Sequence, residues 1–129
     1  MTLVLDTNAY SAFCRGDEKA IQLLEEAERL IVPSIVAGEL ISGFLRGSRW
    51  DANWSDFKLF LTQPGVSLQE TGLVEAEKYG MLVKNLKEAG TPVPTNDIWI
   101  AATALGQGAA VITRDSHFEL FKGLFVVGY

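Results

Sequence analysis

Two short apolar runs, each closely followed by an aspartate, constrain the fold of this chain more than any other feature. Residues 3–5 run directly into Asp6, and residues 109–113 are followed by Arg114 and Asp115. Runs of this length and composition are typical of buried strands. Ligands of open α/β sheets bind outside the carboxyl ends of the strands. We therefore expect Asp6 and Asp115 to lie at one edge of a sheet, where they are candidates for chemistry.

The rest of the chain alternates between helical periodicity and short apolar runs. Helices are predicted at residues 8–15, from the N-cap Asp17 to about residue 30, from the N-cap Ser34 to residue 45, at 50–61, at 73–86, and from the N-cap Thr95 to residue 105. Further strands are predicted at residues 30–32, 66–68 and 124–127. Strands that alternate with helices predict an α/β sandwich, with a mainly parallel central sheet flanked by helices.

Composition is that of a globular intracellular domain. The chain has 129 residues, 48% of them hydrophobic, which favours one domain spanning residues 1–129 with a proper core. Cys14 is the only cysteine, so no intramolecular disulfide forms, as expected in a reducing cytosol. The start of the chain lacks the pattern of a signal peptide. The longest uncharged run, residues 98–113, is shorter than the ~18 residues of a membrane span. We expect a soluble, cytoplasmic protein.

The charge balance narrows the function classes. The formal net charge is −5 at pH 7, whereas proteins that bind nucleic acid by broad charge neutralisation are usually basic. The acidity therefore counts against a simple nucleic-acid-binding module. It is compatible with an enzyme whose acids hold metal ions, because those ions invert the local charge.

Two further acids stand in helices that follow predicted strands. Glu39 lies just over one turn into its helix among apolar neighbours, and Asp97 lies in the first turn of a later helix. Structural roles are open for the acids: Asp6 as a cap or turn residue, Glu39 as a surface glutamate, and Asp97 as a partner of the helix dipole. If the two helices pack beside the strand ends, all four acids meet at one point.

Aromatic residues and the single histidine favour structural roles. Trp50, Trp54, Phe57 and Leu61 form one stripe on a predicted helix, which indicates packing in the core or at an interface rather than base stacking. His117 has no second histidine to pair with, so we expect it to be a turn residue.

Four motifs, in order, resemble the PIN domain, and the size and pattern are similar to the VapC toxins of toxin–antitoxin pairs. The resemblance covers essentially the whole chain. The motifs are Asp6-Thr7-Asn8 after the first strand, Glu39 in an early helix, residues 96–104 with the sequence NDIWIAATA, and residues 112–118 with the sequence ITRDSHF.

The resemblance implies a metal-dependent endoribonuclease, the toxin component of a type II toxin–antitoxin system. Its acidic residues carry over to Asp6, Glu39, Asp97 and Asp115, as catalytic residues and metal ligands, and its supporting polar residues to Asn8 and Thr113. It also implies an RNA substrate, a cognate antitoxin and a homodimer. Family members often carry a further acid just beyond the Asp115 position, where this chain has Ser116 and His117.

The residue types agree with that chemistry independently of the family. Carboxylate oxygens suit Mg²⁺ or Mn²⁺, and clustered carboxylates repel one another, so at least one should have a raised pKa without metal. No residue cluster indicates zinc, NTP binding or acyl transfer. Two alternatives remain. One is a phosphohydrolase with Asp6 as nucleophile, which would need a second Asp where this chain has Asn8. The other is a non-catalytic metal- or phosphate-binding module, which would need a Lys at the end of a late strand, where this chain has Arg114 and Asp115.

Overall fold

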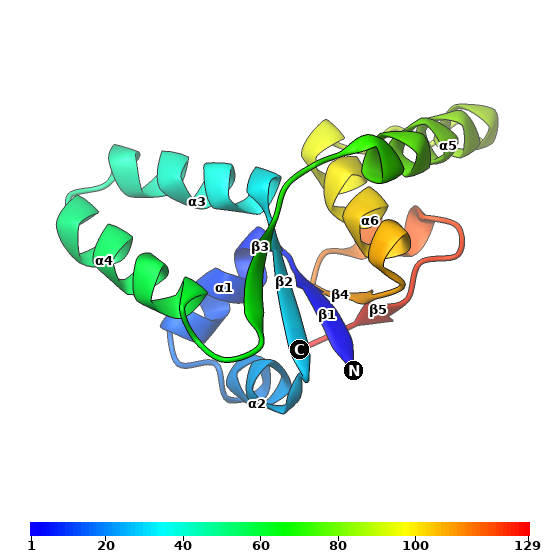
Figure 1. Cartoon of the computed structure of the whole chain (residues 1–129). Coiled ribbons are helices and arrows are strands. Elements are labelled where there is room, and N and C mark those ends of the chain that lie inside the picture. Colours follow the sequence, from blue (N-terminus) through cyan, green and yellow to red (C-terminus); the bar gives the residue numbers. More distant parts are fainter.

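The computed structural model describes all residues, 1–129, and has five parallel strands at its centre (Figure 1). The strands are β1 (Thr2–Leu5), β2 (Arg29–Pro33), β3 (Val66–Gln69), β4 (Ala110–Ile112) and β5 (Val126–Val127). Their order in the sheet is β3-β2-β1-β4-β5, and every neighbouring pair is parallel. The predicted mainly parallel sheet is confirmed, and it is wholly parallel.

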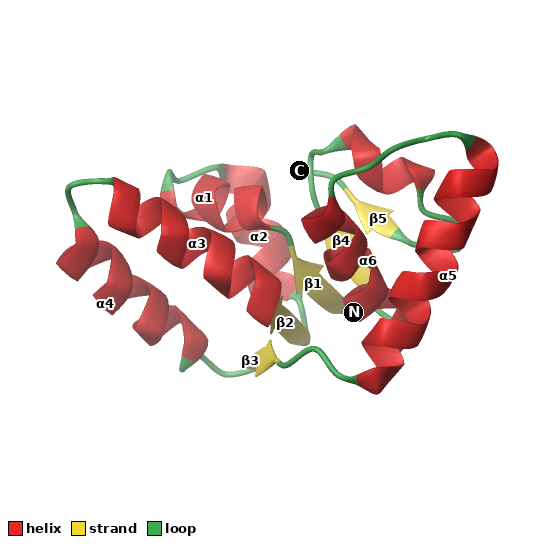
Figure 2. Ribbon diagram, turned by 90° about the horizontal axis from the view of Figure 1, so that it is seen from above, coloured by secondary structure: helices red, strands yellow, loops and turns green.

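Six α-helices and one 3₁₀ helix connect the strands. They are α1 (Thr7–Cys14), α2 (Glu18–Glu26), α3 (Ser34–Arg46), α4 (Trp50–Leu61), α5 (Leu73–Ala89), α6 (Thr95–Gln107) and η1 (Ser116–Leu120). Viewed from above, α1 to α4 lie on one side of the sheet and α5 and α6 on the other (Figure 2). This arrangement confirms the predicted α/β sandwich. None of the helices combines the length and apolar character needed to cross a membrane.

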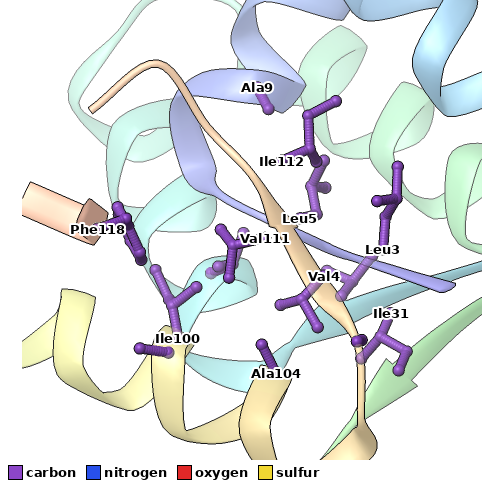
Figure 3. Packing of buried hydrophobic residues seen from close by; sticks show 14 of the residues in the cluster. Leu3, Val4, Leu5, Ala9, Ile31, Ile100, Ala104, Val111, Ile112 and Phe118 are labelled. Carbon is purple, nitrogen blue, oxygen red and sulfur yellow. The ribbon is translucent and has the colours of Figure 1, made fainter. Parts of the chain in front are cut away.

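The core forms where the central strands meet the helices on both sides (Figure 3). Val4, Leu5, Val111 and Ile112 of β1 and β4 are fully buried. Parallel strands covered on both faces are expected to be continuously apolar, as these are. The alanines of α6 are also fully buried, so this helix packs closely against the sheet: Ala101, Ala102 and Ala104.

The structure corrects two predicted helix caps and one strand. Ser34 and Thr95 are the first residues of α3 and α6, and the N-cap positions belong to Pro33 and Pro94. The Ser34 hydroxyl instead donates to the carbonyl of Gln69 at the end of β3. Of the strand predicted at residues 124–127, only Val126–Val127 forms, because β5 is an edge strand whose neighbour β4 has three residues. The predicted Asp17 cap is confirmed, since its carboxylate accepts the Ala20 amide.

The strand order places a topological switch point between β1 and β4. From β1 the chain builds outward through β2 and β3 to one edge, then returns through α5 and α6 to build β4 and β5 on the other side. At such a point the connections leave two adjacent strands in opposite directions, and a crevice opens outside their carboxyl ends. Asp6 follows β1 and Asp115 follows β4, so both acids lie at this crevice.

Candidate active site

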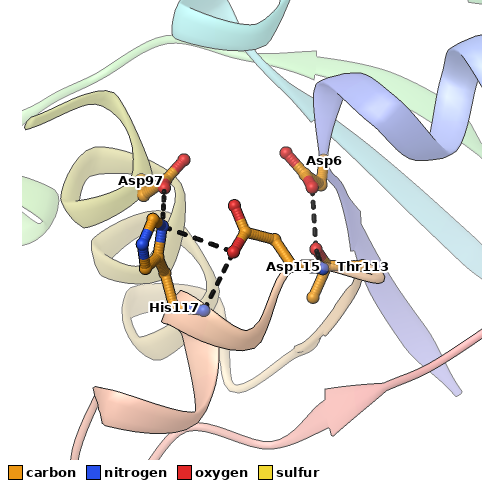
Figure 4. A network of polar contacts seen from close by, with 5 residues as sticks. All are labelled: Asp6, Asp97, Thr113, Asp115 and His117. Atoms are coloured by element: carbon orange, nitrogen blue, oxygen red, sulfur yellow. Dashed lines mark hydrogen bonds and ion pairs between the residues drawn. The ribbon is translucent and has the colours of Figure 1, made fainter. Parts of the chain in front are cut away.

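Thr113 links the acids that follow β1 and β4. Its hydroxyl donates to Oδ2 of Asp6 at 2.7 Å and accepts the backbone amide of Asp115 at 3.0 Å (Figure 4). Asp6 occupies the N-cap position of α1 but makes no capping hydrogen bond with its side chain. The cap explanation for Asp6 is therefore wrong. The residue is only 4% exposed, and its carboxylate accepts a hydrogen bond from a residue 107 positions away.

Asp97, Asp115 and His117 form the tightest group at the site. One ligand atom from each lies within 4.8 Å of the others. Nδ1 of His117 is 3.5 Å from Oδ2 of Asp97 and 3.3 Å from Oδ1 of Asp115, yet this nitrogen is shielded from solvent and makes no well-directed hydrogen bond. Asp115 also caps η1 by accepting the His117 amide at 2.9 Å, which turns the imidazole toward Asp97 (Figure 4).

Glu39 approaches the same edge of the sheet from α3. Oε1 of Glu39 accepts the Thr7 hydroxyl at 2.6 Å, so a residue adjacent to Asp6 holds it in place. Glu39 and Asn96, the neighbour of Asp97, both line a groove of about 540 Å³. A more apolar cavity of about 360 Å³ between the end of α5 and the start of α6 contains none of the four acids.

Five of the predicted site residues lie at the crevice: Asp6, Glu39, Asp97, Thr113 and Asp115. Asn8, two residues after Asp6, is exposed and its side chain makes no hydrogen bond, so its supporting role stays a prediction. Sequence reasoning missed Thr7 and His117. A usable signal existed for His117: an Asp two residues before it can cap a short helical turn and so bring the two side chains together. We expected His117 to be a turn residue. Its place in η1 agrees with that expectation, but its contacts with Asp97 and Asp115 were not expected.

Burial dominates the electrostatics of these acids. It raises the pKa of Asp6 from 3.8 to about 6, against the hydrogen bond from Thr113, and the charges of Asp97 and Glu39 raise it further. Burial also raises the pKa of Asp97, followed by the charge of Asp115, while His117 lowers it. The expected raised pKa is thus confirmed, although desolvation contributes more than repulsion between carboxylates.

The donor set fits a divalent cation with a preference for hard oxygen ligands. Asp97, Asp115 and His117 offer ligand atoms within 4.8 Å of one another, so Nδ1 of His117 adds a nitrogen to the carboxylate oxygens. Asp6 is not part of this group, but it lies near enough for the charge of Asp97 to raise its pKa. Mg²⁺ and Mn²⁺ favour carboxylate oxygens, and Mg²⁺ usually binds only one or two carboxylates together with water. The only cysteine, Cys14, is not part of the group, so nothing here favours a soft metal.

Comparisons with known proteins give one consistent family. The sequence model of the PIN domain matches residues 3–124. Ribonuclease VapC4 of Mycobacterium tuberculosis is 34% identical over 98 residues, which cover 74% of this chain and 74% of that protein. Ribonuclease VapC1 of Haemophilus influenzae is 29% identical over 120 residues, which cover 89% of this chain and 87% of that protein.

Solved structures agree with this fold. VapBC-1 from nontypeable Haemophilus influenzae matches with a TM-score of 0.87 at 26% identity, covering 99% of this chain and 98% of that chain. VapBC2 from Rickettsia felis, bound to a DNA fragment from its promoter, matches with a TM-score of 0.89 at 23% identity, covering 100% and 99%. The second likeness concerns the fold alone.

Proposed function

Because this chain belongs to the PIN domain family, we propose that it is a metal-dependent endoribonuclease, the toxin component of a type II toxin–antitoxin system. The observation that carries the proposal is the meeting of Asp6, Glu39, Asp97 and Asp115 at the switch point of the sheet. Curated relatives of similar length are named VapC ribonucleases. We propose that residues 1–129 act as one domain, in the cytoplasm where the RNA substrate occurs.

The proposed metal is Mg²⁺ or Mn²⁺, held by Asp6, Asp97 and Asp115, with Glu39 facing the same groove. When bound, such an ion activates a water for attack on the phosphodiester and stabilises the leaving oxygen. The protein's own residues fix the ligands before any ion arrives. Thr113 orients Asp6, Thr7 orients Glu39, and the cap of η1 orients Asp115. Because these supports are short hydrogen bonds, little reorganisation accompanies metal binding.

Partners follow from the same family. Solved relatives include a member of the VapBC family of toxin–antitoxin systems from Mycobacterium tuberculosis and a toxin–antitoxin complex from Klebsiella pneumoniae. We propose that a cognate antitoxin binds and silences this chain, and that two copies form a homodimer. We propose that the antitoxin inhibits the site with a basic side chain that enters it and pairs with the carboxylates.

A ribonuclease assay with and without metal tests the proposal. Purified protein should degrade single-stranded RNA in Mg²⁺ or Mn²⁺ and leave it intact in EDTA. Release of phosphate from small phosphomonoesters, without RNA cleavage, would indicate the phosphohydrolase instead. Metal binding with neither activity would indicate a non-catalytic binding module. Either of these two results would refute the proposed function.

A further inference from the structure

A polar groove extends from the carboxylates along α3. The lining residues that matter here are Gly38, Glu39, Ser42 and Arg46 of α3, Thr71 before α5, and Asn96 of α6. We refer to this feature, about 540 Å³ in volume, as the α3 groove. Glu39 and Asn96 mark the end next to the acids, since Glu39 is bonded to Thr7 and Asn96 precedes Asp97.

Arg46 marks the other end of the α3 groove. It lies seven residues after Glu39, which places it about 10 Å further along the helix. Its guanidinium donates from Nη1 to the Ser42 hydroxyl at 2.6 Å, so the side chain is held back along α3, within the groove. Both Ser42 and Arg46 are exposed, so the remaining guanidinium donors are open to a ligand.

Charge identifies the ligand that fits this arrangement. Arg46 is the one cationic side chain that lines the α3 groove, in a protein of net charge −5. The carboxyl end of α3 adds partial negative charge from its free carbonyls. A polyanion that lies across the acids needs a cation beside its next phosphates, and the planar guanidinium pairs with phosphate oxygens through two parallel hydrogen bonds.

Gly38 leaves space at the end of the α3 groove next to the acids. A Cβ atom built on Gly38 meets no atom within 4 Å, so packing of the protein does not require glycine there. A glycine inside a helix costs about 0.5–1 kcal/mol relative to alanine. The structural effect of this glycine is space beside Glu39, at the end of the groove next to the acids and about two helical turns before Arg46.

From these observations we propose that the substrate RNA lies along α3, and that Arg46 binds a phosphate flanking the one that is cleaved. This inference rests on the proposed ribonuclease function and adds the path that the RNA follows across the protein. In this proposal Arg46 binds the substrate and takes no part in the chemical step. Gly38, without a side chain, leaves the space that the RNA needs.

The test measures RNA binding separately from cleavage. A labelled single-stranded RNA is titrated with wild type and Arg46→Met in Ca²⁺, a hard cation that neutralises carboxylates, with a gel showing that the RNA stays intact. Arg46→Met should raise Kd about tenfold. It should also reduce the slope of log K against log salt by about 0.7, the contribution of one phosphate on a single strand. Arg46→Lys should restore part of the affinity.

Two comparisons make the result specific. Arg29→Met is the matched control and should leave Kd and salt slope unchanged. Arg29 is an exposed arginine at the start of β2, and the acids lie beyond the other, carboxyl ends of the strands. Gly38→Leu should fold with unchanged circular dichroism and bind RNA at least several-fold more weakly. In Mg²⁺, Arg46→Met should raise KM with kcat nearly unchanged, a split that a purely structural role does not produce.

Unchanged Kd, KM and salt slope for Arg46→Met would overturn the proposal. That result would indicate that Arg46 contacts a protein partner instead of RNA. Failure of the proposed function looks different. In that case no variant cleaves RNA in Mg²⁺, whereas binding in Ca²⁺ still reports whether Arg46 contacts phosphate.

Discussion

One threonine hydroxyl holds two of the acids of this site in place. Thr113 donates to buried Asp6 and accepts the amide of Asp115, so residues that follow two neighbouring strands share one support. Asp6 is only 4% exposed and has a single side-chain donor, so its carboxylate remains poorly solvated. The raised pKa of Asp6 is the direct consequence.

Asp6 therefore makes the stability of the metal-free protein depend on pH. Its pKa rises from 3.8 to about 6 on folding, so between these values the folded state binds more protons than the unfolded state. The free energy of unfolding should fall as pH rises through this window, by about 3 kcal/mol at most, and then level off. Asp6→Asn removes the titrating group. In EDTA at pH 7.5 it should melt several degrees above wild type, with the difference vanishing near pH 4.

Added Mn²⁺ provides the control for this prediction. A ligand that binds only the folded state raises the melting temperature by mass action, so Mn²⁺ should stabilise wild type more than Asp6→Asn. Thermal melts across pH in EDTA and in Mn²⁺ measure both effects. If Asp6→Asn melted well below wild type in EDTA at pH 7.5, the carboxylate would be a structural support.

At the scale of elements, the turn that leads into β3 depends on one glycine. Gly65 has a φ of +80°, and a Cβ built on it would lie 2.8 Å from the carbonyl oxygen of Glu28. Its own carbonyl accepts the amide of Leu30, which starts the pairing of β2 with β3. Gly65→Ala should therefore destabilise the protein by more than about 1–2 kcal/mol.

Gly80 is the matched control for this substitution. It lies inside α5, and a Cβ there meets no atom within 4 Å. Gly80→Ala should stabilise the protein by up to about 1 kcal/mol through helix propensity. Urea denaturation of both variants measures these changes. Equal stability of Gly65→Ala and wild type would show that the turn adapts without strain.

The elements were largely predictable from the sequence because hydrophobic periodicity and glycine or proline boundaries are local signals. The helix starts were less predictable. Ser34 and Thr95 are good cap residues by type, but each follows a proline whose extended backbone already provides the N-cap position. Contacts between distant segments give no local signal in the sequence. The hydrogen bond between Thr7 and Glu39 and the contact between His117 and Asp97 are therefore visible only in the structure.

At the scale of the whole molecule, the strand order decides where the site forms. The sequence predicted strands that end in acids but not that β1 and β4 are neighbours, because pairing across 107 residues follows from the packing of α5 and α6. Once β1 and β4 pair, Asp6 and Asp115 converge without any further requirement. The burial of Asp6 likewise depends on the assembled sheet and helices. The sequence therefore predicted a raised pKa from repulsion between carboxylates, but not that desolvation is its larger cause.

The assembled molecule also leaves apolar side chains uncovered. Leu73, Val74 and Met81 of α5 are between 54% and 87% exposed, and Trp50 and Trp54 stack on each other while only half-buried. Where exposed apolar side chains form a contiguous patch, they mark a contact surface, and these residues are the candidates for one. We predict that light scattering at micromolar concentration gives twice the chain mass of 14.1 kDa. A monomer at that concentration would contradict the proposed homodimer.

Cleavage by Asp97→Asn tests most directly whether the clustered acids carry out the reaction. Asp97 lies in the first turn of α6, and Asp51 lies in the first turn of α4, away from the site, so Asp51→Asn is its matched control. In Mg²⁺, Asp97→Asn should lose more than the ~100-fold of activity that outer-shell partners of metal ligands typically contribute. Its circular dichroism should remain unchanged, and Asp51→Asn should cleave RNA as wild type does. Cleavage by Asp97→Asn at a rate near wild type would contradict this account of the site.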